Sequence, residues 1–393
     1  MKTQTKQQLI TLAIDTSCDE TCAAVTCGWE VWSNVVASQI ELHRPYGGVF
    51  PTIAKQAHQE NIRPVVKAAL QRSHSQLADV EQIAVTIGPG LAPALEVGIN
   101  YAQELAQQIK KPLLAINHIE AHLLSPHALA RPKMAWQNLV SEKQRANKKS
   151  QQHQFEFSLP ALGLVVSGGH TMFILVEKKS LLNNSEMVVD RQPNLNLTLQ
   201  AGQPGLNSGQ FQYTVLGQTI DDAAGEALDK IGRLLNLGYP AGPVMEQLAK
   251  AGNPRQYDWP LPMTNQRNYN LSFSGLKTNT RNFIETNWGQ KQPTKQEVCN
   301  LAASIQYAIF RHICYKLNKI LQKNPQIKNI WLGGGVAANL TLRKMIRQTL
   351  KKQSQQSKLL NCNPRQLLVP NSKKLCGDNA AMIGLVAAHS SFY

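Results

Sequence analysis

Leu9-Ile-Thr-Leu-Ala-Ile14 is followed by Asp15, by the polar loop Thr16-Ser-Cys-Asp-Glu20, and by a second apolar run from Cys22 to Thr26. The first run predicts a buried strand that ends at Asp15, and the second predicts a strand that returns from the loop. The same order of strand, small polar loop and strand recurs at Ala161-Leu-Gly-Leu-Val-Val166, Ser167-Gly-Gly-His170 and Thr171 to Val176. We interpret this as an internal duplication at the level of structure, although two unrelated hairpins would give the same pattern.

Helical segments alternate with further strands along the chain. Strands are expected at 82–87, 112–116 and 327–332, with helices at 51–73, interrupted or restarted at Pro64, and from 91 to 109. Such alternation predicts a largely parallel sheet with covered faces, and 393 residues suffice for two lobes that each have a core. Residues 131–158 and 178–212 are rich in polar residues and read as insertions without recognisable chemistry.

The chain is strongly basic, with Lys+Arg 41 against Asp+Glu 25 and a net charge of +16. Nine basic residues and no acidic one lie between Arg343 and Gly377, and a second basic run lies between Arg131 and Lys149. A merely solvated face mixes both signs, so this clustering favours a polyanionic partner such as nucleic acid. A generally basic proteome, or simple solubility, is the alternative for the net charge alone.

The cysteines and the apolar segments indicate the compartment. The seven cysteines form no regular framework, which favours a reducing environment. No signal peptide or transmembrane stretch is evident, so we expect a cytoplasmic protein that makes no use of a membrane.

His118 and His122 stand four residues apart, a spacing that places two imidazoles on one face of a helix and suits a shared metal ion. Glu120 would point away from the pair, which argues against the H-E-x-x-H mechanism of metalloproteases. Asp378, in a short loop before a helix, is the best distant candidate for a third ligand. Two histidines and one carboxylate suit Zn²⁺ or Fe²⁺. Helix capping by Asp378 and a chance histidine pair are the alternatives.

Three glycine-rich loops follow predicted strands, at Gly88-Pro-Gly90, Ser167-Gly-Gly169 and Gly333-Gly-Gly335. Glycine lets backbone N–H groups approach an anion, so together the loops favour a phosphate or nucleotide ligand. Neither the P-loop nor the G-x-G-x-x-G pattern is present.

A family resemblance covers about residues 9 to 388. The motifs that carry it are Asp15-Thr-Ser-Cys-Asp-Glu20, Gly88-Pro-Gly-Leu91, His118-Ile-Glu-Ala-His122, Val165-Val-Ser-Gly-Gly-His-Thr171, Ile220-Asp-Asp-Ala-Ala-Gly-Glu226, Ser272-Phe-Ser-Gly-Leu-Lys-Thr278, Gly334-Gly-Val-Ala-Ala-Asn339 and Asp378-Asn379. With these motifs in this order, the chain resembles the TsaD family, the tRNA threonylcarbamoyladenosine transferases formerly described as O-sialoglycoprotein endopeptidases of the glycoprotease family. Ala92, Pro93, Glu96 and Ala241 depart from the family pattern.

The resemblance implies an α/β, actin-like (sugar kinase/Hsp70-like) fold of two duplicated lobes with the active site in the interlobe cleft. Residues 1–117 would form the first lobe and 118–378 the second, with the final helix, about 379–393, packed back on the first. The implied reaction transfers the threonylcarbamoyl group from threonylcarbamoyl-AMP to the exocyclic amine of the adenosine adjacent to the anticodon, in tRNAs that read codons beginning with A.

The resemblance also implies site residues and partners. His118, His122 and Asp378 would hold one divalent metal per subunit, Fe²⁺ in preference to Zn²⁺. The substrate-binding residues would be Val165, Val166, Ser167, Gly168, Gly169, Asp229, Gly242 and Asn339. No general base is assigned, although Asp19 and Glu20 lie near the predicted cleft. The implied partners are tRNA, a small paralogous subunit and an ATPase of the TsaB and TsaE type. An ATP-dependent small-molecule kinase of the same fold and a non-catalytic RNA-binding scaffold subunit are the competing hypotheses.

Overall fold

The first half of the chain forms a six-stranded sheet with the strand order β5-β4-β1-β2-β3-β6. The computed structural model describes residues 9–130, 157–179, 211–289, 291–357 and 364–391. The three N-terminal strands pair antiparallel, whereas β4 and β5 run parallel to β1. The strands are β1 (Ile10–Asp15), β2 (Glu20–Cys27), β3 (Glu30–Ser38), β4 (Gln82–Gly88), β5 (Leu113–Asn117) and β6 (Leu129–Ala130).

The chain from residue 161 onward, called the second half below, repeats this arrangement in a five-stranded sheet of order β11-β10-β7-β8-β9. Here β7, β8 and β9 pair antiparallel, while β10 and β11 run parallel to β7. Strand for strand, this is the order and direction of β1 to β5, so the duplication predicted from the sequence is present in the topology. The strands are β7 (Ala161–Val166), β8 (Thr171–Lys178), β9 (Phe211–Gln218), β10 (Asn329–Gly333) and β11 (Gln366–Leu368).

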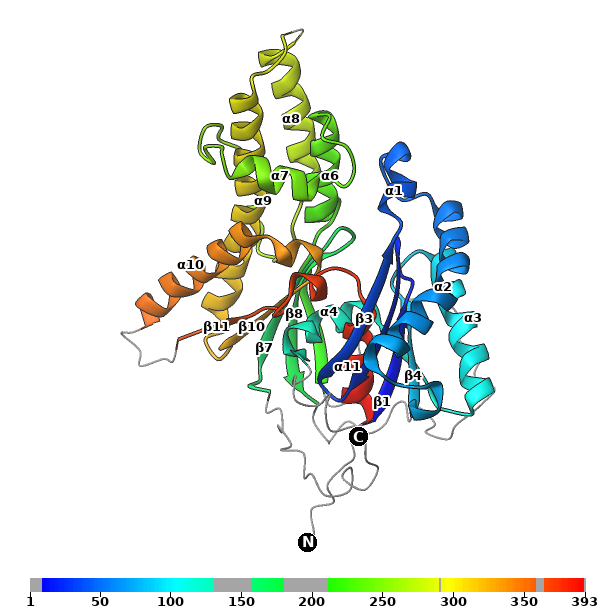
Figure 1. The fold of residues 1–393 in the computed structure, drawn as a ribbon. Coiled ribbons are helices and arrows are strands. Elements are labelled where there is room, and N and C mark those ends of the chain that lie inside the picture. The colour runs from blue at the N-terminus through cyan, green and yellow to red at the C-terminus, as the bar shows by residue number, and fades with distance from the viewer. Residues whose placement is uncertain (1–8, 131–156, 180–210, 290, 358–363, 392–393) are drawn as a thin grey trace.

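Helices join and cover the strands (Figure 1). On the first sheet, α2 packs against β2 and β3, and α3 against β4. On the second, α6 to α9 gather at the upper end of the view, above the sheet. The helices are α1 (Ile40–His43), α2 (Pro51–Ser73), α3 (Ala92–Ile109), α4 (His118–Leu124), α6 (Ala224–Leu234), α7 (Gly242–Ala249), α8 (Ser274–Asn287), α9 (Lys295–Lys323), α10 (Leu340–Ser357) and α11 (Ala380–Ser391).

The helices α4 and α11 lie between the two sheets, and each contacts the sheet formed by the other part of the chain. α4 follows the first sheet yet contacts β7 and β10 of the second, whereas α11 follows the second sheet and packs on β1, β2 and β3 of the first. The two helices also contact each other, and their apolar residues join those of both sheets in one hydrophobic core. Burial of this shared core fixes the N-terminal ends of α4 and α11 side by side.

One sequence-based expectation is corrected. Helix α2 runs unbroken through Pro64, because Pro64 and Glu60 are both exposed and water can bond the Glu60 carbonyl that lacks its helical donor. Strand β6, which follows α4 in the sequence, pairs with β3 at the edge of the first sheet. The division into lobes at 117 and 378 stays a prediction. The expected insertions at 131–158 and 178–212 lie almost wholly outside the described residues.

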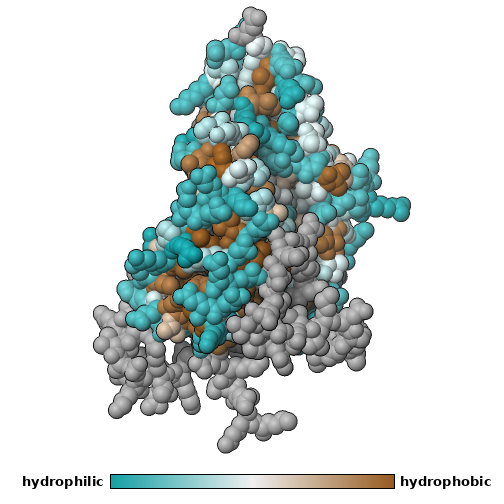
Figure 2. Space-filling view, turned by 90° about the vertical axis from the view of Figure 1, so that its right-hand side faces the viewer, coloured by the Kyte–Doolittle hydropathy of each residue, from teal (hydrophilic) through white to brown (hydrophobic). Residues whose placement is uncertain are grey.

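The surface mixes polar and apolar residues. On the face in Figure 2, hydrophobic residues form separate patches among hydrophilic ones. None of the helices in the described ranges combines the length and the apolar composition that a membrane span requires.

Candidate active site and metal centre

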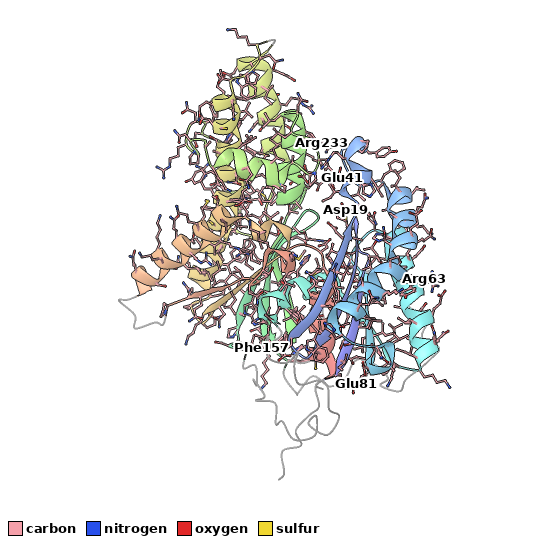
Figure 3. All side chains as sticks on the ribbon, viewed as in Figure 1. Asp19, Glu41, Arg63, Glu81, Phe157 and Arg233 are labelled. Atoms are coloured by element: carbon pink, nitrogen blue, oxygen red, sulfur yellow. The ribbon has the colours of Figure 1, made fainter. Side chains whose placement is uncertain are left out.

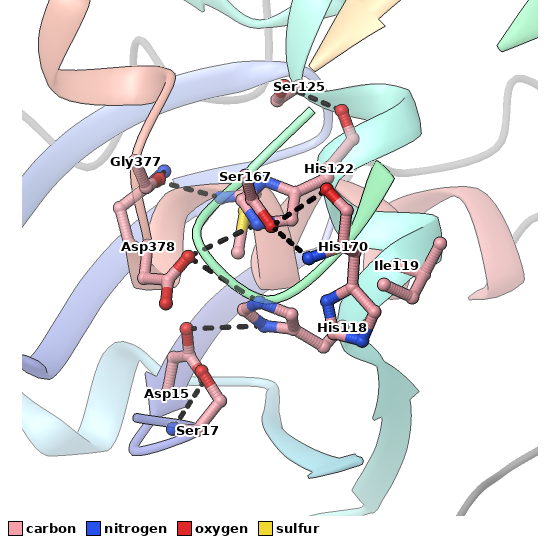
Figure 4. Close-up of polar contacts among 12 residues, drawn as sticks. Asp15, Ser17, His118, Ile119, His122, Ser125, Ser167, His170, Gly377 and Asp378 are labelled. Carbon is pink, nitrogen blue, oxygen red and sulfur yellow. Dashed lines mark hydrogen bonds and ion pairs between the residues drawn. The ribbon is translucent and has the colours of Figure 1, made fainter. Parts of the chain in front are cut away.

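The three predicted metal ligands converge at the contact between α4 and α11 (Figure 4). His118 and His122 lie on the first two turns of α4, and Asp378 lies just before α11. The Asp378 Oδ1 atom is 3.1 Å from Nε2 of His122 and 3.5 Å from Nε2 of His118. One ligand atom from each residue falls within 4.8 Å of the others.

The geometry fits a shared metal ion. Two atoms that each bind one ion at about 2.1 Å, at a tetrahedral angle, lie about 3.4 Å apart, close to both observed separations. Coordination through Nε2 requires the proton on Nδ1, and the buried Nδ1 atoms of both histidines lack a hydrogen-bond partner. Oδ2 of buried Asp15, also without a partner, lies 3.7 Å from Nδ1 of His118 and is placed to orient that ring.

Electrostatics at the site favour a cation. Burial alone would lower the pKa of His118, but the carboxylates of Asp378 and Asp15 outweigh it and raise this pKa to about 9. Burial lowers the pKa of His122. Although burial opposes ionisation of Asp378, the two histidines hold its pKa well below the usual value. The site therefore pairs buried carboxylates with a positive charge, which either a proton or a metal ion supplies.

Glu120 points away from the ligands, as predicted. Its side chain is buried, and its Oε1 accepts a 2.6 Å hydrogen bond from the hydroxyl of Tyr213 on β9. No glutamate thus faces the metal site from the position that a metalloprotease uses.

A cleft of about 720 Å³ opens from the metal site and is walled by residues of both halves of the chain. The three glycine-rich loops all reach it, through Pro89 and Gly90, through residues 167–169, and through Gly335. Gly90 is required because a Cβ there would lie 2.5 Å from the Ser17 carbonyl oxygen. In contrast, a Cβ at Gly168 or Gly169 would meet nothing within 4 Å, so a ligand can approach their backbone.

The predicted substrate-binding residues divide into two groups. Ser167, Gly168, Gly169, Asp229, Gly242 and Asn339 line the cleft. Val165 and Val166 do not, because their side chains are fully buried at the end of β7 and pack into two different cores. They position the Ser167 loop. This loop is closed by a 2.7 Å hydrogen bond that Ser167 N donates to the carbonyl of His170.

Asp229 and Asn339 also have structural partners. Oδ1 of Asp229 accepts 2.8 Å hydrogen bonds from the backbone N–H groups of Ala241 and Gly242, while burial raises the pKa of the carboxyl. Oδ1 of Asn339 caps α10, accepting from the N–H groups of Thr341 and Leu342. Asn339 Nδ2 donates to the Gln306 side chain at 2.8 Å. Both residues are therefore held in fixed orientations at the cleft wall.

Several cleft residues escaped the sequence analysis. His170 lines the cleft, and burial lowers its pKa to about 4, so its imidazole is neutral. Lys230 and Arg233 of α6 also line the cleft, and Figure 3 shows Arg233 close to Glu41, with Asp19 below both. His170 was visible in its motif, but nothing local signalled that the residues of α6 would face the first half.

Asp221 precedes α6 in the sequence, where a carboxylate would suit the positive end of the helix dipole, but it does not serve that helix. Its carboxylate caps α8 instead, accepting bonds from Phe273 N at 2.8 Å and from the Ser272 and Ser274 hydroxyls at 2.5 and 2.7 Å. These bonds outweigh partial burial and lower the pKa of Asp221. The 271–274 turn is thereby tied to the loop before α6.

Comparison with known proteins identifies the family. The sequence model described as TsaD, tRNA N6-adenosine threonylcarbamoyltransferase, matches residues 30–136 and 179–385. Proteins named tRNA N6-adenosine threonylcarbamoyltransferase from Syntrophotalea carbinolica and Lactiplantibacillus plantarum are 35% and 37% identical over 96% and 98% of this chain, and over 90% of each relative. The chain belongs to the TsaD family.

TsaD membership makes the protein a transferase of tRNA modification. A further relative of the same name, from Clostridium beijerinckii, is 38% identical over 96% of this chain and 91% of its own. Among solved structures, HypF from T. kodakarensis superposes with a TM-score of 0.50 at 15% identity, covering 98% of this chain and 48% of HypF. The fold is the actin-like α/β fold predicted from the sequence.

Proposed function

We propose that this TsaD protein transfers the threonylcarbamoyl group from threonylcarbamoyl-AMP to N6 of the adenosine adjacent to the anticodon, in tRNAs reading codons that begin with A. The observation that carries the proposal is the cleft itself. It brings a two-histidine, one-carboxylate metal set and three glycine-rich loops, which are separated in sequence by up to 290 residues (378 − 88), to one space. That space suits an acyl-adenylate whose acyl group lies at the metal set.

The metal set and the loops receive different parts of the donor. A divalent ion held by His118, His122 and Asp378, iron in preference to zinc, supplies a Lewis acid for the threonylcarbamoyl group. The exposed backbone of Gly168 and Gly169 receives the phosphate of the adenylate. Asp229 offers an acceptor for ribose hydroxyls, and Gly242 lets the nucleoside approach the start of α7.

A carboxylate pair in the cleft wall suits the proton transfer. When the adenosine amine attacks the carbamoyl carbon, a C–N bond forms, the bond to the phosphate oxygen breaks, AMP leaves and the amine loses a proton. Glu20 lines the cleft beside Asp19, and burial together with the Asp19 charge raises its pKa well above the usual value. A carboxyl group with a raised pKa is a more effective proton acceptor near neutral pH. We assign Glu20, paired with Asp19, as the candidate base.

The proposal extends to the partners and the compartment. We expect tRNA as the acceptor, and a small paralogous subunit with an ATPase of the TsaB and TsaE type as protein partners, in the cytoplasm. The net charge of +16 supports a polyanionic acceptor.

The test supplies threonylcarbamoyl-AMP, unmodified tRNA and the partner proteins, and measures threonylcarbamoyladenosine by mass spectrometry after digestion of the tRNA. The expected result is product with the wild-type protein and none above a mock reaction with Asp378→Ala or His118→Ala, which should also lose bound metal in elemental analysis. Asp258→Ala removes a carboxylate with a 92% exposed side chain and serves as the control. Absence of product with the folded, metal-loaded protein, or phosphorylation of a small molecule by ATP instead, would refute the proposal.

A further inference from the structure

The solvent face of α10 is basic along its length. Lys344, Arg347, Lys351 and Lys352 are exposed, and we call these four residues the α10 basic face. At 100° per residue they span an arc of about 140°. The opposite side of the helix is buried in the core of the second half through Leu342, Ile346 and Leu350.

Among the described residues, no carboxylate forms an ion pair with this face. The other exposed residues of α10 within the same arc are Leu340, Gln348 and Gln355, and all three are uncharged. Within the described part of the chain, no ion pair involves the four basic residues, whereas Arg63 and Lys230 on other helices pair with carboxylates. Keeping four uncompensated charges on one helix face costs free energy through their mutual repulsion, which an anionic partner would relieve.

The α10 basic face leads directly out of the cleft. α10 begins at its cap Asn339, a residue of the cleft wall, and its 18 residues extend about 27 Å away from it (Figure 1). Exposed Lys373 and Lys374 lie five and four residues before Asp378, so positive charge also stands close to the metal set. Positive charge therefore continues from the reaction site to the outer end of the second half.

We propose that the α10 basic face is a docking surface for the sugar–phosphate backbone of the tRNA, on the part of the molecule that remains outside the cleft. This inference rests on the proposed function. A cleft of about 720 Å³ has room for the donor and one inserted nucleotide but not for a folded tRNA, so most of the contact surface lies outside it. Lysine, arginine and glutamine side chains are the groups that bind phosphate and sugar without reading sequence.

The composition of the face distinguishes tRNA from an anionic membrane. Peripheral helices that bind lipid place several Trp, Phe or Leu side chains beside their basic residues, whereas on α10 the apolar side chains lie in the core or pack against it, apart from exposed Leu340 in the first turn. A docking surface that reads only phosphates also suits an enzyme that accepts several tRNAs.

The experiment compares two double variants that remove one arginine and one lysine each. Arg347→Gln/Lys351→Gln alters the α10 basic face, and Lys67→Gln/Arg72→Gln alters exposed residues of α2 in the first half. Affinity for unmodified full-length tRNA is measured by fluorescence anisotropy between 50 and 300 mM KCl, approximately the range over which counterion release is linear in log salt. If each residue contacts one phosphate, the α10 variant binds about 25- to 60-fold more weakly at 0.1 M salt. The slope of log affinity against log salt should become shallower by about 1.4 to 1.8.

The control variant should retain the wild-type affinity and slope, and the KM for tRNA should rise only in the α10 variant, with the KM for the donor unchanged. Equal changes in both variants, or no change in either, would overturn the inference. So would a loss of binding to phosphatidylserine vesicles that is not matched by a loss of binding to tRNA. Wild-type protein that binds tRNA through α10 but forms no modified nucleoside would refute the proposed function while leaving this surface intact.

Discussion

Gly333, the last residue of β10, lies so close to helix α4 that a methyl group added there would clash with the backbone of the helix. A Cβ on Gly333 would lie 2.1 Å from the carbonyl oxygen of His122 and 2.8 Å from its carbonyl carbon. These are backbone atoms, so no side-chain rotation relieves the clash. Since real Cβ contacts stay beyond 3.0 Å, Gly333→Ala must separate β10 from α4 by about 0.9 Å (3.0 − 2.1).

Two consequences of different size follow. Overpacking of this kind costs about 1–3 kcal/mol of unfolding free energy, which a protein of this size can tolerate. The metal set is more sensitive, because metal–ligand distances hold to about 0.2 Å and the displaced carbonyl belongs to the ligand His122. We therefore expect Gly333→Ala to fold yet bind the divalent metal at least about tenfold more weakly. This loss of affinity is comparable to the loss that follows mutation of a residue hydrogen-bonded to a metal ligand.

Gly335→Ala is the matched control, two residues further along the same loop. A Cβ on Gly335 would meet only Gly377 Cα, at 3.9 Å, which is ordinary contact. Metal affinity is measured by calorimetric titration of the metal-free proteins, and thermal unfolding monitored by circular dichroism separates loss of fold from loss of metal. Wild-type metal affinity in Gly333→Ala, or an equal loss in both variants, would refute the argument that β10 positions His122.

Two further predictions concern stability. Burial and nearby Lys316 lower the pKa of His312 to about 4, below the ordinary value of 6.5. Between pH 4 and 6.5 the unfolded chain therefore binds more protons than the folded protein, and the free energy of unfolding decreases as the pH falls from 6.5 to 4. The unfolding free energy of His312→Gln, measured by urea titration, should fall less steeply than that of wild type over this range, by about 1.4 kcal/mol per pH unit; parallel curves would contradict the assignment. Asp221→Ala removes the cap of α8 and should cost about 0.5–2 kcal/mol in the same assay, whereas Asp222→Ala, which breaks a partly exposed ion pair with Lys230, should cost less.

The sequence alone anticipated much of the molecule where the signal is local. The apolar runs around Asp15 and Val166 predicted the strands that begin each sheet, and the small polar loop after each run marked the edge of the sheet where the cleft opens. The i, i+4 spacing of His118 and His122 predicted a shared helix face, and the position of Glu120 predicted that it would point away. Each of these inferences depends on periodicity within a few residues, which the backbone geometry of a strand or helix fixes.

Other features depended on residues distant in sequence. Asp221 lies near the start of α6 and suits its helix dipole, but it caps α8, some 50 residues later, because the 271–274 turn folds back onto its loop. Pro64 indicated a helix break that exposure to solvent avoids. Val165 and Val166 share a motif with cleft residues, yet their strand buries both side chains. Local propensity cannot distinguish these outcomes, since solvent exposure and packing partners decide them.

The candidate active site also combines features that the local sequence determines with features that only the tertiary structure decides. By itself the sequence determined the ligand types, the helix that carries the two histidines and the loops that suit a phosphate, because each is a short pattern with its own chemistry. Only the tertiary structure brought Asp378 to Nε2 of His118 and His122, across 256 residues from His122. It did so because α4 and α11 each bury their apolar residues in the core shared by the two sheets, which holds their N-terminal ends together.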